Sequence, residues 1–116
     1  MAKFETFEDI IAWQKSRILV VDIYQVFKNS KDYSFRDQIQ RAAVSIMNNI
    51  AEGYERKGNK EFVKFLYIAK GSCAEVRSML YLALDLHCIN KDEFEKMYQQ
   101  AIEISRMLSG LVKTLC

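Results

Sequence analysis

The sequence predicts an all-α protein with one domain over residues 1–116, an antiparallel up-down-up-down four-helix bundle. Three observations lead to this prediction. The chain has no proline and only 4 glycines, the residues that most often interrupt helices. Apolar residues recur every three or four positions through four long segments, which indicates helices rather than strands. Only a few residues separate these segments, so neighbouring helices are expected to run antiparallel.

The first helix is expected to begin at Thr6 and to run to about Asn29, with Glu8 and Asp9 in the first turn, where the helix dipole favours acids. Residues 18–21 read ILVV. Four successive apolar residues cover most of a helix circumference, so they cannot all face one core. This pattern favours packing against a second subunit. The alternative is a first helix that lies well buried in its own bundle.

The second helix is predicted to be capped by Ser34, with Asp37 three residues later, and to stop at Gly58. Asn59 is predicted to cap the third helix. The predicted core-facing residues of the second helix are Ile39, Ala42, Ala43, Ile46, Met47, Ile50, Ala51 and Tyr54.

The third helix carries a comparable stripe, which consists of Phe62, Phe65, Leu66, Ala69, Cys73, Val76, Leu80, Ala83, Leu84 and His87. Asn90 and Glu93 have the spacing of a capping box and are predicted to open the fourth helix. The stripe of that helix consists of Phe94, Met97, Tyr98, Ala101, Ile104, Ser105, Leu108, Leu111, Val112 and Leu115.

The residue types that support catalysis or metal binding are scarce. The only histidine is His87, so a di-iron site, which needs a Glu-x-x-His pair on each of two helices, is excluded by ligand count. We expect His87 to lie in the last turn of the third helix, where the dipole favours it. The three cysteines form no CxxC pair, and Cys73 falls on the apolar stripe. The sequence therefore predicts a protein that is not an enzyme and has no metal and no cofactor.

Polar residues near the stripes form two pairs with a spacing of three, Asn49 with Glu52 and Ser72 with Glu75. Buried together, these groups can hydrogen-bond between helices and fix their register, because unpaired burial costs a few kcal/mol. Two alternatives remain at this point: a polar ligand pocket, and simple exposure to solvent.

Basic residues raise the question of nucleic-acid binding, although the formal net charge is only +2. Cations at these positions can contact phosphates, with Tyr54 and Tyr67 available to stack on bases. The alternative is a solvated face, in which cations at a helix C-terminus only complement its dipole. The candidate contact residues are Arg41, Arg56, Lys57, Lys60 and Lys64.

Two segments carry a resemblance to a known family. They are IIAWQKSRILVVDIYQVF at residues 10–27 and RAAVSIMNNIAEGYERKGNKEFVKFLYIAKGSCAEVRSML at residues 41–80. They resemble the four-helix-bundle proteins encoded in intervening sequences of bacterial 23S ribosomal RNA genes, and the resemblance covers essentially the whole chain. Its most specific part is RAAVSI followed by NIAEG. Met47 stands where relatives often carry proline, and Gln40 where many carry arginine.

The resemblance implies a homopentamer, with the bundles arranged as a ring around a central channel. It also implies kinship with the accessory protein of diversity-generating retroelements, a similar pentamer that binds nucleic acid and a reverse transcriptase. The family as a whole has no established enzymatic function. The resemblance therefore implies three partners: further copies of the chain, RNA or DNA, and a protein such as a reverse transcriptase.

Taken together, the sequence predicts a non-enzymatic homo-oligomer that binds nucleic acid through basic residues repeated by symmetry. The alternative is a scaffold that recruits a protein partner without contacting nucleic acid. The N-terminal MAKFETFEDI has no basic-then-apolar signal pattern, and charges interrupt every apolar run before it reaches the length of a membrane span. We therefore expect a cytoplasmic protein with no membrane partner.

Overall fold

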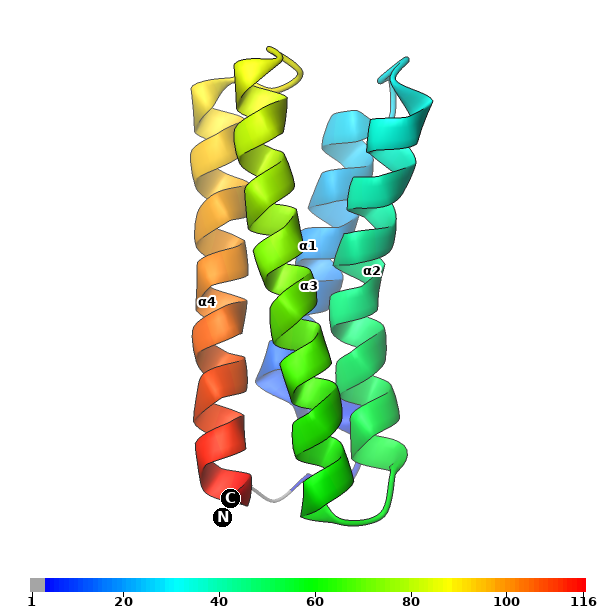
Figure 1. Cartoon of the computed structure of the whole chain (residues 1–116), viewed down its shortest axis with the longest axis vertical. Helices are drawn as coiled ribbons and strands as arrows, with labels where there is room; N and C mark the ends of the chain where they lie inside the picture. Colours follow the sequence, from blue (N-terminus) through cyan, green and yellow to red (C-terminus); the bar gives the residue numbers. More distant parts are fainter. Residues whose placement is uncertain (1–3) are drawn as a thin grey trace.

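The computed structural model describes residues 4–116 and confirms an all-α chain of four packed helices (Figure 1). Residues 1–3 lie outside the described residues. They begin the N-terminal segment MAKFETFEDI, in which the sequence shows no signal pattern. A short 3₁₀ turn, η1, precedes the helices. The elements are η1 (Phe7–Asp9), α1 (Ile11–Phe27), α2 (Tyr33–Glu55), α3 (Asn59–Asp85) and α4 (Lys91–Leu115).

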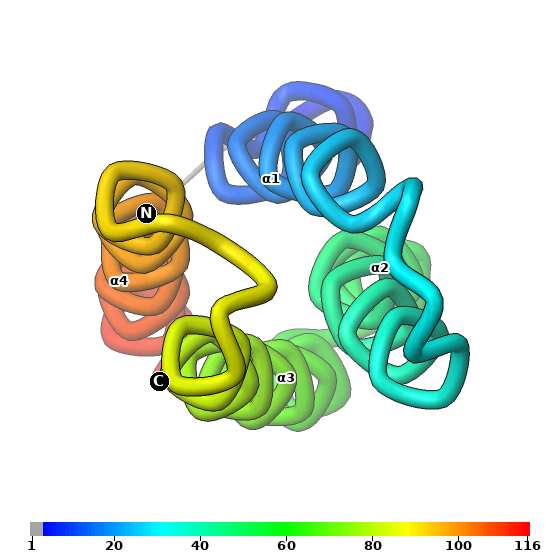
Figure 2. Tube along the Cα trace, turned by 90° about the horizontal axis from the view of Figure 1, so that it is seen from above, coloured from blue at the N-terminus to red at the C-terminus, as the bar shows by residue number. Residues whose placement is uncertain are grey.

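The four helices run alternately up and down along a molecule with extents of 43 × 21 × 19 Å (Figure 1). Seen from above, they form a square in which each helix packs against the next and α4 packs against α1 (Figure 2). Helices α1 and α3 are therefore diagonal to each other, with the core between them (Figure 2). The outer faces of α1 and α3 point to opposite sides of the bundle.

The core is one continuous cluster of apolar side chains that all four helices supply at the spacings the sequence predicts. Its largest fully buried members are Phe27, Ile10, Leu19, Ile23, Ile39, Ile46, Ile50, Leu66, Leu80, Met97, Ile104 and Leu108. Burial of each such side chain contributes about 1.5–3 kcal/mol, so this stripe packing is the main source of stability.

The N-terminus departs from the single long helix that the sequence predicts. Thr6 opens only the 3₁₀ turn, and the Asp9 carboxylate accepts hydrogen bonds from the backbone N–H groups of Glu5 (3.0 Å) and Thr6 (3.2 Å). The backbone is then extended at Ile10 (φ −78°, ψ 117°), whose side chain is only 1% exposed. Burial of Ile10 in the core accompanies this break, and α1 begins at Ile11.

Two predicted caps are wrong by one or two residues. Asp32, not Ser34, caps α2, because its carboxylate accepts the backbone N–H of Phe35 at 3.1 Å. Gly58, not Asn59, caps α3, and it has a φ of 102° that favours glycine over all other residues. The chain therefore turns sharply between Glu55, where α2 ends, and the first turn of α3.

The connection between α3 and α4 places His87 outside the helix in which it was predicted. Helix α3 ends at Asp85, and His87 has a left-handed φ of 61°. Its N–H donates to the Leu84 carbonyl at 3.0 Å, and the Cys88 N–H donates to the Ala83 carbonyl at 2.8 Å. These two bonds form a Schellman motif, which satisfies the last carbonyls of α3.

The capping box predicted at the start of α4 is confirmed. The Asn90 side chain accepts from the Glu93 N–H at 2.8 Å, and the Glu93 carboxylate accepts from the Asn90 N–H at 2.9 Å. Because both bonds are local, this cap could be read directly from the spacing of the two residues.

Candidate nucleic-acid interface

The structure gathers four of the five predicted cations at one end of the bundle. Arg56, Lys57, Lys60 and Lys64 lie around the turn between α2 and α3, and all four are exposed. Arg41 lies elsewhere, because it precedes Arg56 by 15 positions on α2, about 22 Å at 1.5 Å per residue. The turn cluster, defined as Arg56, Lys57, Lys60 and Lys64, is therefore a separate surface from Arg41.

Acidic side chains offset part of the positive charge of the turn cluster. The Arg56 guanidinium lies 3.1 Å from the Glu52 carboxylate and 5.0 Å from the centre of the Phe65 ring. Glu55 and Glu61 stand in the adjoining helix ends. An exposed pair of this kind contributes at most about 1 kcal/mol, but it reduces the charge that Arg56 presents to a phosphate.

The predicted polar residues are divided between a hydrogen-bond network and the surface. The Ser72 hydroxyl on α3 donates to the Ser45 hydroxyl on α2 at 2.9 Å. The Asn49 amide donates to the Ser45 carbonyl (2.8 Å) and hydroxyl (2.9 Å). Ser45, which the sequence reasoning missed, therefore joins Asn49 to Ser72 across the two helices. Its position four residues before Asn49, on the same helix face, is the signal that could have revealed it.

The two glutamates of the predicted network lie outside this junction. Glu75 accepts a separate interhelical hydrogen bond from the Gln38 amide of α2 at 3.2 Å. Glu52 instead points toward Arg56, and its side chain is exposed. The junction between α2 and α3 therefore rests on neutral groups, with Glu75 as an exposed addition.

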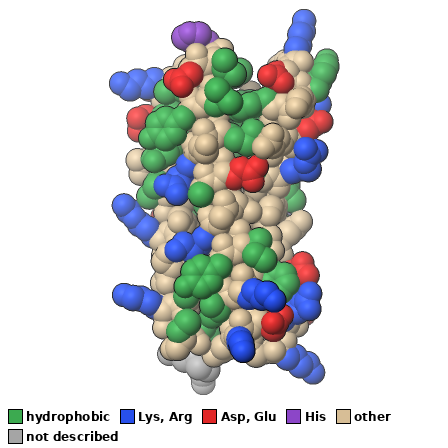
Figure 3. Space-filling model, viewed as in Figure 1, with side chains coloured by type: hydrophobic (Ala, Val, Ile, Leu, Met, Phe, Trp, Pro, Cys, Tyr) green, Lys and Arg blue, Asp and Glu red, His purple; other side chains and the backbone are tan. Residues whose placement is uncertain are grey.

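A second basic surface, which the sequence reasoning did not identify, lies in a groove between α3 and α4. Its volume is about 430 Å³, and Figure 3 shows basic side chains along this side of the molecule with hydrophobic ones between them. Among the described residues that line it, three are cations and none is acidic. The groove is lined by Tyr67, Lys70, Arg106, Ser109, Gly110, Val112 and Lys113.

The α3–α4 groove brings together residues that are far apart in the sequence. Lys70 lies 5.7 Å from the centre of the Tyr67 ring, a cation–π contact within α3. Arg106 and Lys113 are seven positions apart, so they share one face of α4, about 10 Å from each other along the helix. Arg106 and Lys113 are 36 and 43 positions from Lys70 in the sequence, and only the antiparallel packing of α3 and α4 places them beside it.

Aromatic side chains and one more arginine extend this surface toward the upper end of the bundle. The Tyr81 and Tyr98 rings pack edge to face at 5.3 Å, and Tyr98 stacks on Phe94 at 5.2 Å. The pKa of Tyr98 is lowered, chiefly by its interaction with the neighbouring Tyr81 hydroxyl and further by the nearby Arg77 guanidinium, and the pKa of Tyr81 is raised, chiefly by its interaction with Tyr98. The Arg77 Nε atom is buried and has no hydrogen-bond partner among residues 4–116.

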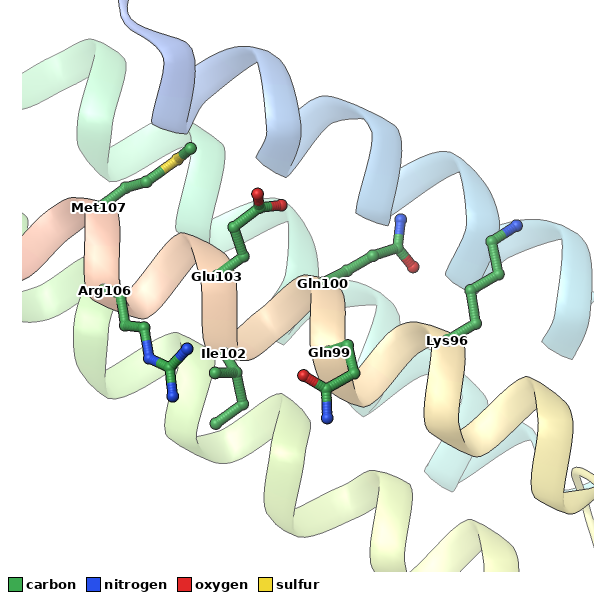
Figure 4. Close-up of a pocket in the computed structure, with 7 residues that line it drawn as sticks. All are labelled: Lys96, Gln99, Gln100, Ile102, Glu103, Arg106 and Met107. Atoms are coloured by element: carbon green, nitrogen blue, oxygen red, sulfur yellow. The ribbon is translucent and has the colours of Figure 1, made fainter.

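Another hollow lies against α4 alone, and its residues do not converge on a common point (Figure 4). Figure 4 shows the side chains directed to both flanks of the helix: Lys96, Gln99, Gln100, Ile102, Glu103, Arg106 and Met107. Lys96 pairs with Asp22 at 3.6 Å, and Glu103 pairs with Lys15 at 3.5 Å, so these residues tie α4 to α1. The hollow is open helix surface rather than a ligand site.

The described part of the chain holds no group of three or more His, Cys, Asp or Glu residues that could bind a metal ion. Cys73 is completely buried, and burial raises the pKa of its thiol to about 12. Such a thiol stays protonated near neutral pH, which suits a core residue and not a nucleophile. Within residues 4–116, no helix combines the length and the apolar character needed to cross a membrane.

Comparisons with known proteins agree with this fold. A family model described as 23S rRNA-intervening sequence protein matches residues 8–110. A crystal structure at 1.70 Å of a protein of unknown function, from the S23 ribosomal protein family of Bacteroides thetaiotaomicron VPI-5482, is similar at a TM-score of 0.83 and 25% identity. The similarity covers 88% of this chain and 98% of that one. No curated protein matches the chain.

Proposed function

The chain belongs to the 23S rRNA-intervening sequence protein family, and we propose that it acts as a non-enzymatic, homo-oligomeric protein that binds RNA or DNA. The proposed assembly is the homopentamer that the sequence resemblance implies. The similar solved protein is itself of unknown function, so the argument for binding rests on the surface of this chain.

The observation that carries the proposal is the α3–α4 groove, where three cations meet and no described lining residue is acidic. The ion pairs formed within residues 4–116 involve Lys15, Arg36, Arg56 and Lys96. The groove cations are therefore outside these pairs and available to phosphates. The turn cluster is a weaker candidate, because Arg56 is already paired with Glu52.

The dimensions of the groove suit the phosphate backbone of a helical strand. Arg106 and Lys113 are spaced by about 10 Å along α4, close to three nucleotide rises of about 3.4 Å on one strand. Tyr67, at 56% exposure, offers a ring face on which a base can stack. The groove follows the long axis of the bundle, so it can contact several consecutive phosphates.

A symmetric assembly strengthens this proposal, because the net charge of one chain is only +2. In a ring, each copy presents the same groove, and one nucleic acid can contact several of them at once. Contacts linked in this way gain affinity by raising the effective concentration at each further site. The proposed binding therefore depends on assembly as well as on the groove.

The test is fluorescence anisotropy with labelled RNA and labelled duplex DNA at several salt concentrations. Log K should fall linearly with log salt for the native chain, because counterions are released from the phosphates. Replacing Lys70, Arg106 and Lys113 with glutamine should weaken binding strongly. The matched control replaces Lys57, Lys60 and Lys64, which removes the same charge from the turn cluster and should have a smaller effect.

The opposite ranking of the two triple variants would move the contact to the turn cluster, which consists of four of the five residues first predicted. No binding by the native chain at low salt would overturn the proposal. A protein scaffold would then be favoured, and the exposed Tyr and aliphatic side chains on α1 and α3 support it as the second candidate. Its partner would be a protein such as the reverse transcriptase that the resemblance implies.

A further inference from the structure

Exposed apolar side chains are concentrated on two of the four helices. Ten large hydrophobic residues are exposed in the described chain. Four lie on α1 (Ile11, Ile18, Val21 and Tyr24) and four on α3 (Tyr67, Ile68, Tyr81 and Leu82), each about half exposed. None lies on α4 and one lies on α2. The α1 face and the α3 face, defined by these two sets, are thus the apolar surfaces that the monomer leaves uncovered.

The α1 face and the α3 face point away from each other. Helices α1 and α3 are diagonal in the bundle and run in the same direction (Figures 1 and 2). The α1 face of one molecule therefore cannot cover its own α3 face. A head-to-tail, heterologous contact between copies requires two different surfaces, such as these two uncovered faces on opposite sides. Repetition of such a contact gives a ring or a filament.

Contacts through α4 show that the two faces lie at the same height along the bundle. Asp22 of α1 accepts from the Gln100 amide at 2.9 Å and pairs with Lys96 at 3.6 Å. Between these two residues on α4 lies Tyr98, whose ring packs at 5.3 Å from that of Tyr81 on α3. Asp22 and Tyr81 are therefore at about the same height along the bundle. The heights of the other residues of α1 and α3 can be counted from these two positions.

Charges at matching heights are complementary. Arg17 lies five residues below Asp22, and Glu75 lies six residues below Tyr81, so both are about 8–9 Å lower at 1.5 Å per residue. At the other end, Lys28 follows α1 and Asp85 ends α3, and both are exposed. Parallel packing at about equal height thus brings Arg17 near Glu75 and Lys28 near Asp85, while Val21 lies within about 3 Å in height of Ser78.

The geometry points to a second copy of this chain as the occupant: the α1 face of one copy docks on the α3 face of the next, head to tail, with the two helices parallel. This inference rests on the proposed homo-oligomer and names its contact surface. Ile68, Glu75 and Leu82 lie on the side of α3 toward α2, since Glu75 bonds to Gln38. The contact can therefore form along that side through Ile68 and Leu82 of the α3 face, which leaves Tyr67 to the α3–α4 groove.

Thiol cross-linking tests this contact in a chain whose exposed cysteines, Cys88 and Cys116, are replaced with serine; Cys73 is buried and is kept. Val21→Cys and Ser78→Cys are placed singly and together, and a short bis-maleimide reagent is added. The double variant should give a ladder of covalent oligomers on a denaturing gel, and each single variant should remain monomeric. The control pairs Val21→Cys with Gln99→Cys, on exposed α4 surface outside the docking faces, and should give no ladder.

Native mass spectrometry of the same samples separates the possible failures. An oligomer without a ladder would overturn the docking and leave the homo-oligomer standing. An oligomer in which Val21→Cys alone forms covalent dimers would also overturn it, because that result means a two-fold contact between α1 faces. A monomer would overturn the homo-oligomer itself. As a second readout, Arg17→Glu should disrupt assembly, and adding Glu75→Arg should restore it.

Discussion

The Ser72 hydroxyl of α3 donates a hydrogen bond to the Ser45 hydroxyl of α2 at 2.9 Å, where the two helices pack together. Asn49 also donates to Ser45, so three polar groups satisfy one another inside an otherwise apolar contact. This arrangement specifies how α2 and α3 are aligned along their length. It costs little stability, because each buried group has a partner.

Ser72→Ala should lower the free energy of unfolding by about 1 kcal/mol, because the interhelical hydrogen bond is lost. The measurement is urea denaturation followed by circular dichroism. Ser34→Ala, at an exposed position on α2, is the control and should leave stability within about 0.5 kcal/mol. Equal stability of the two variants would show that the bond between Ser72 and Ser45 does not stabilise the bundle.

Gly53→Ala should destabilise the bundle by about 1–3 kcal/mol through overpacking. A Cβ atom at Gly53 would lie 2.5 Å from Cβ of Phe65 and 3.2 Å from a ring carbon of Phe62, both on α3. Gly110→Ala is the matched control, because a Cβ there meets nothing within 4 Å. It should stabilise α4 by about 0.5–1 kcal/mol. Thermal unfolding of both variants checks the opposite signs.

His87→Gly should raise the free energy of unfolding by about 0.5–1 kcal/mol, because glycine adopts a left-handed φ without the steric cost that a side chain imposes. The native φ of His87 is 61°. His87→Val should have the opposite effect, since a β-branched residue is strongly disfavoured at positive φ. Chemical denaturation of the pair tests the assignment, and a stabilising valine would contradict it.

The buried Cys73 thiol should make stability fall at alkaline pH. Its pKa is raised from 9.0 to about 12 by burial, so the unfolded chain loses this proton at lower pH than the folded chain does. The stabilisation is complete below pH 9 and declines between pH 9 and 12, by at most about 1.4 kcal/mol per pH unit. Stability curves of native protein and Cys73→Ala should diverge only in this interval, and parallel curves would contradict the assignment.

Lys113→Gln should reduce the salt dependence of duplex-DNA binding by about 0.9 in the slope of log K against log salt, the effect of one lost phosphate contact. Lys57→Gln, in the turn cluster, is the control and should leave the slope nearly unchanged. The measurement is the anisotropy titration described above. A change that appears only in the control would place the phosphate contact at the turn.

The chain itself determined its helices and most of its core, because helical periodicity and the Asn90–Glu93 cap depend on residues only a few positions apart. The excess of apolar residues at 18–21 is matched by the exposure of Ile18 and Val21, while Leu19 is buried. The uncovered α1 face was thus readable from sequence, although the proposed docking surface on α3 was not.

Only the tertiary structure decided which distant residues meet. It joined Ser72 to Asn49 through Ser45 and separated Arg41 from the turn cluster. It also formed a basic groove that contains Lys70 and Lys113, which are 43 positions apart. It also moved two helix caps, because a cap depends on where one side chain reaches a free backbone N–H. The physical reason is one of range: periodicity is a local property of the chain, whereas a surface between two helices exists only once they pack.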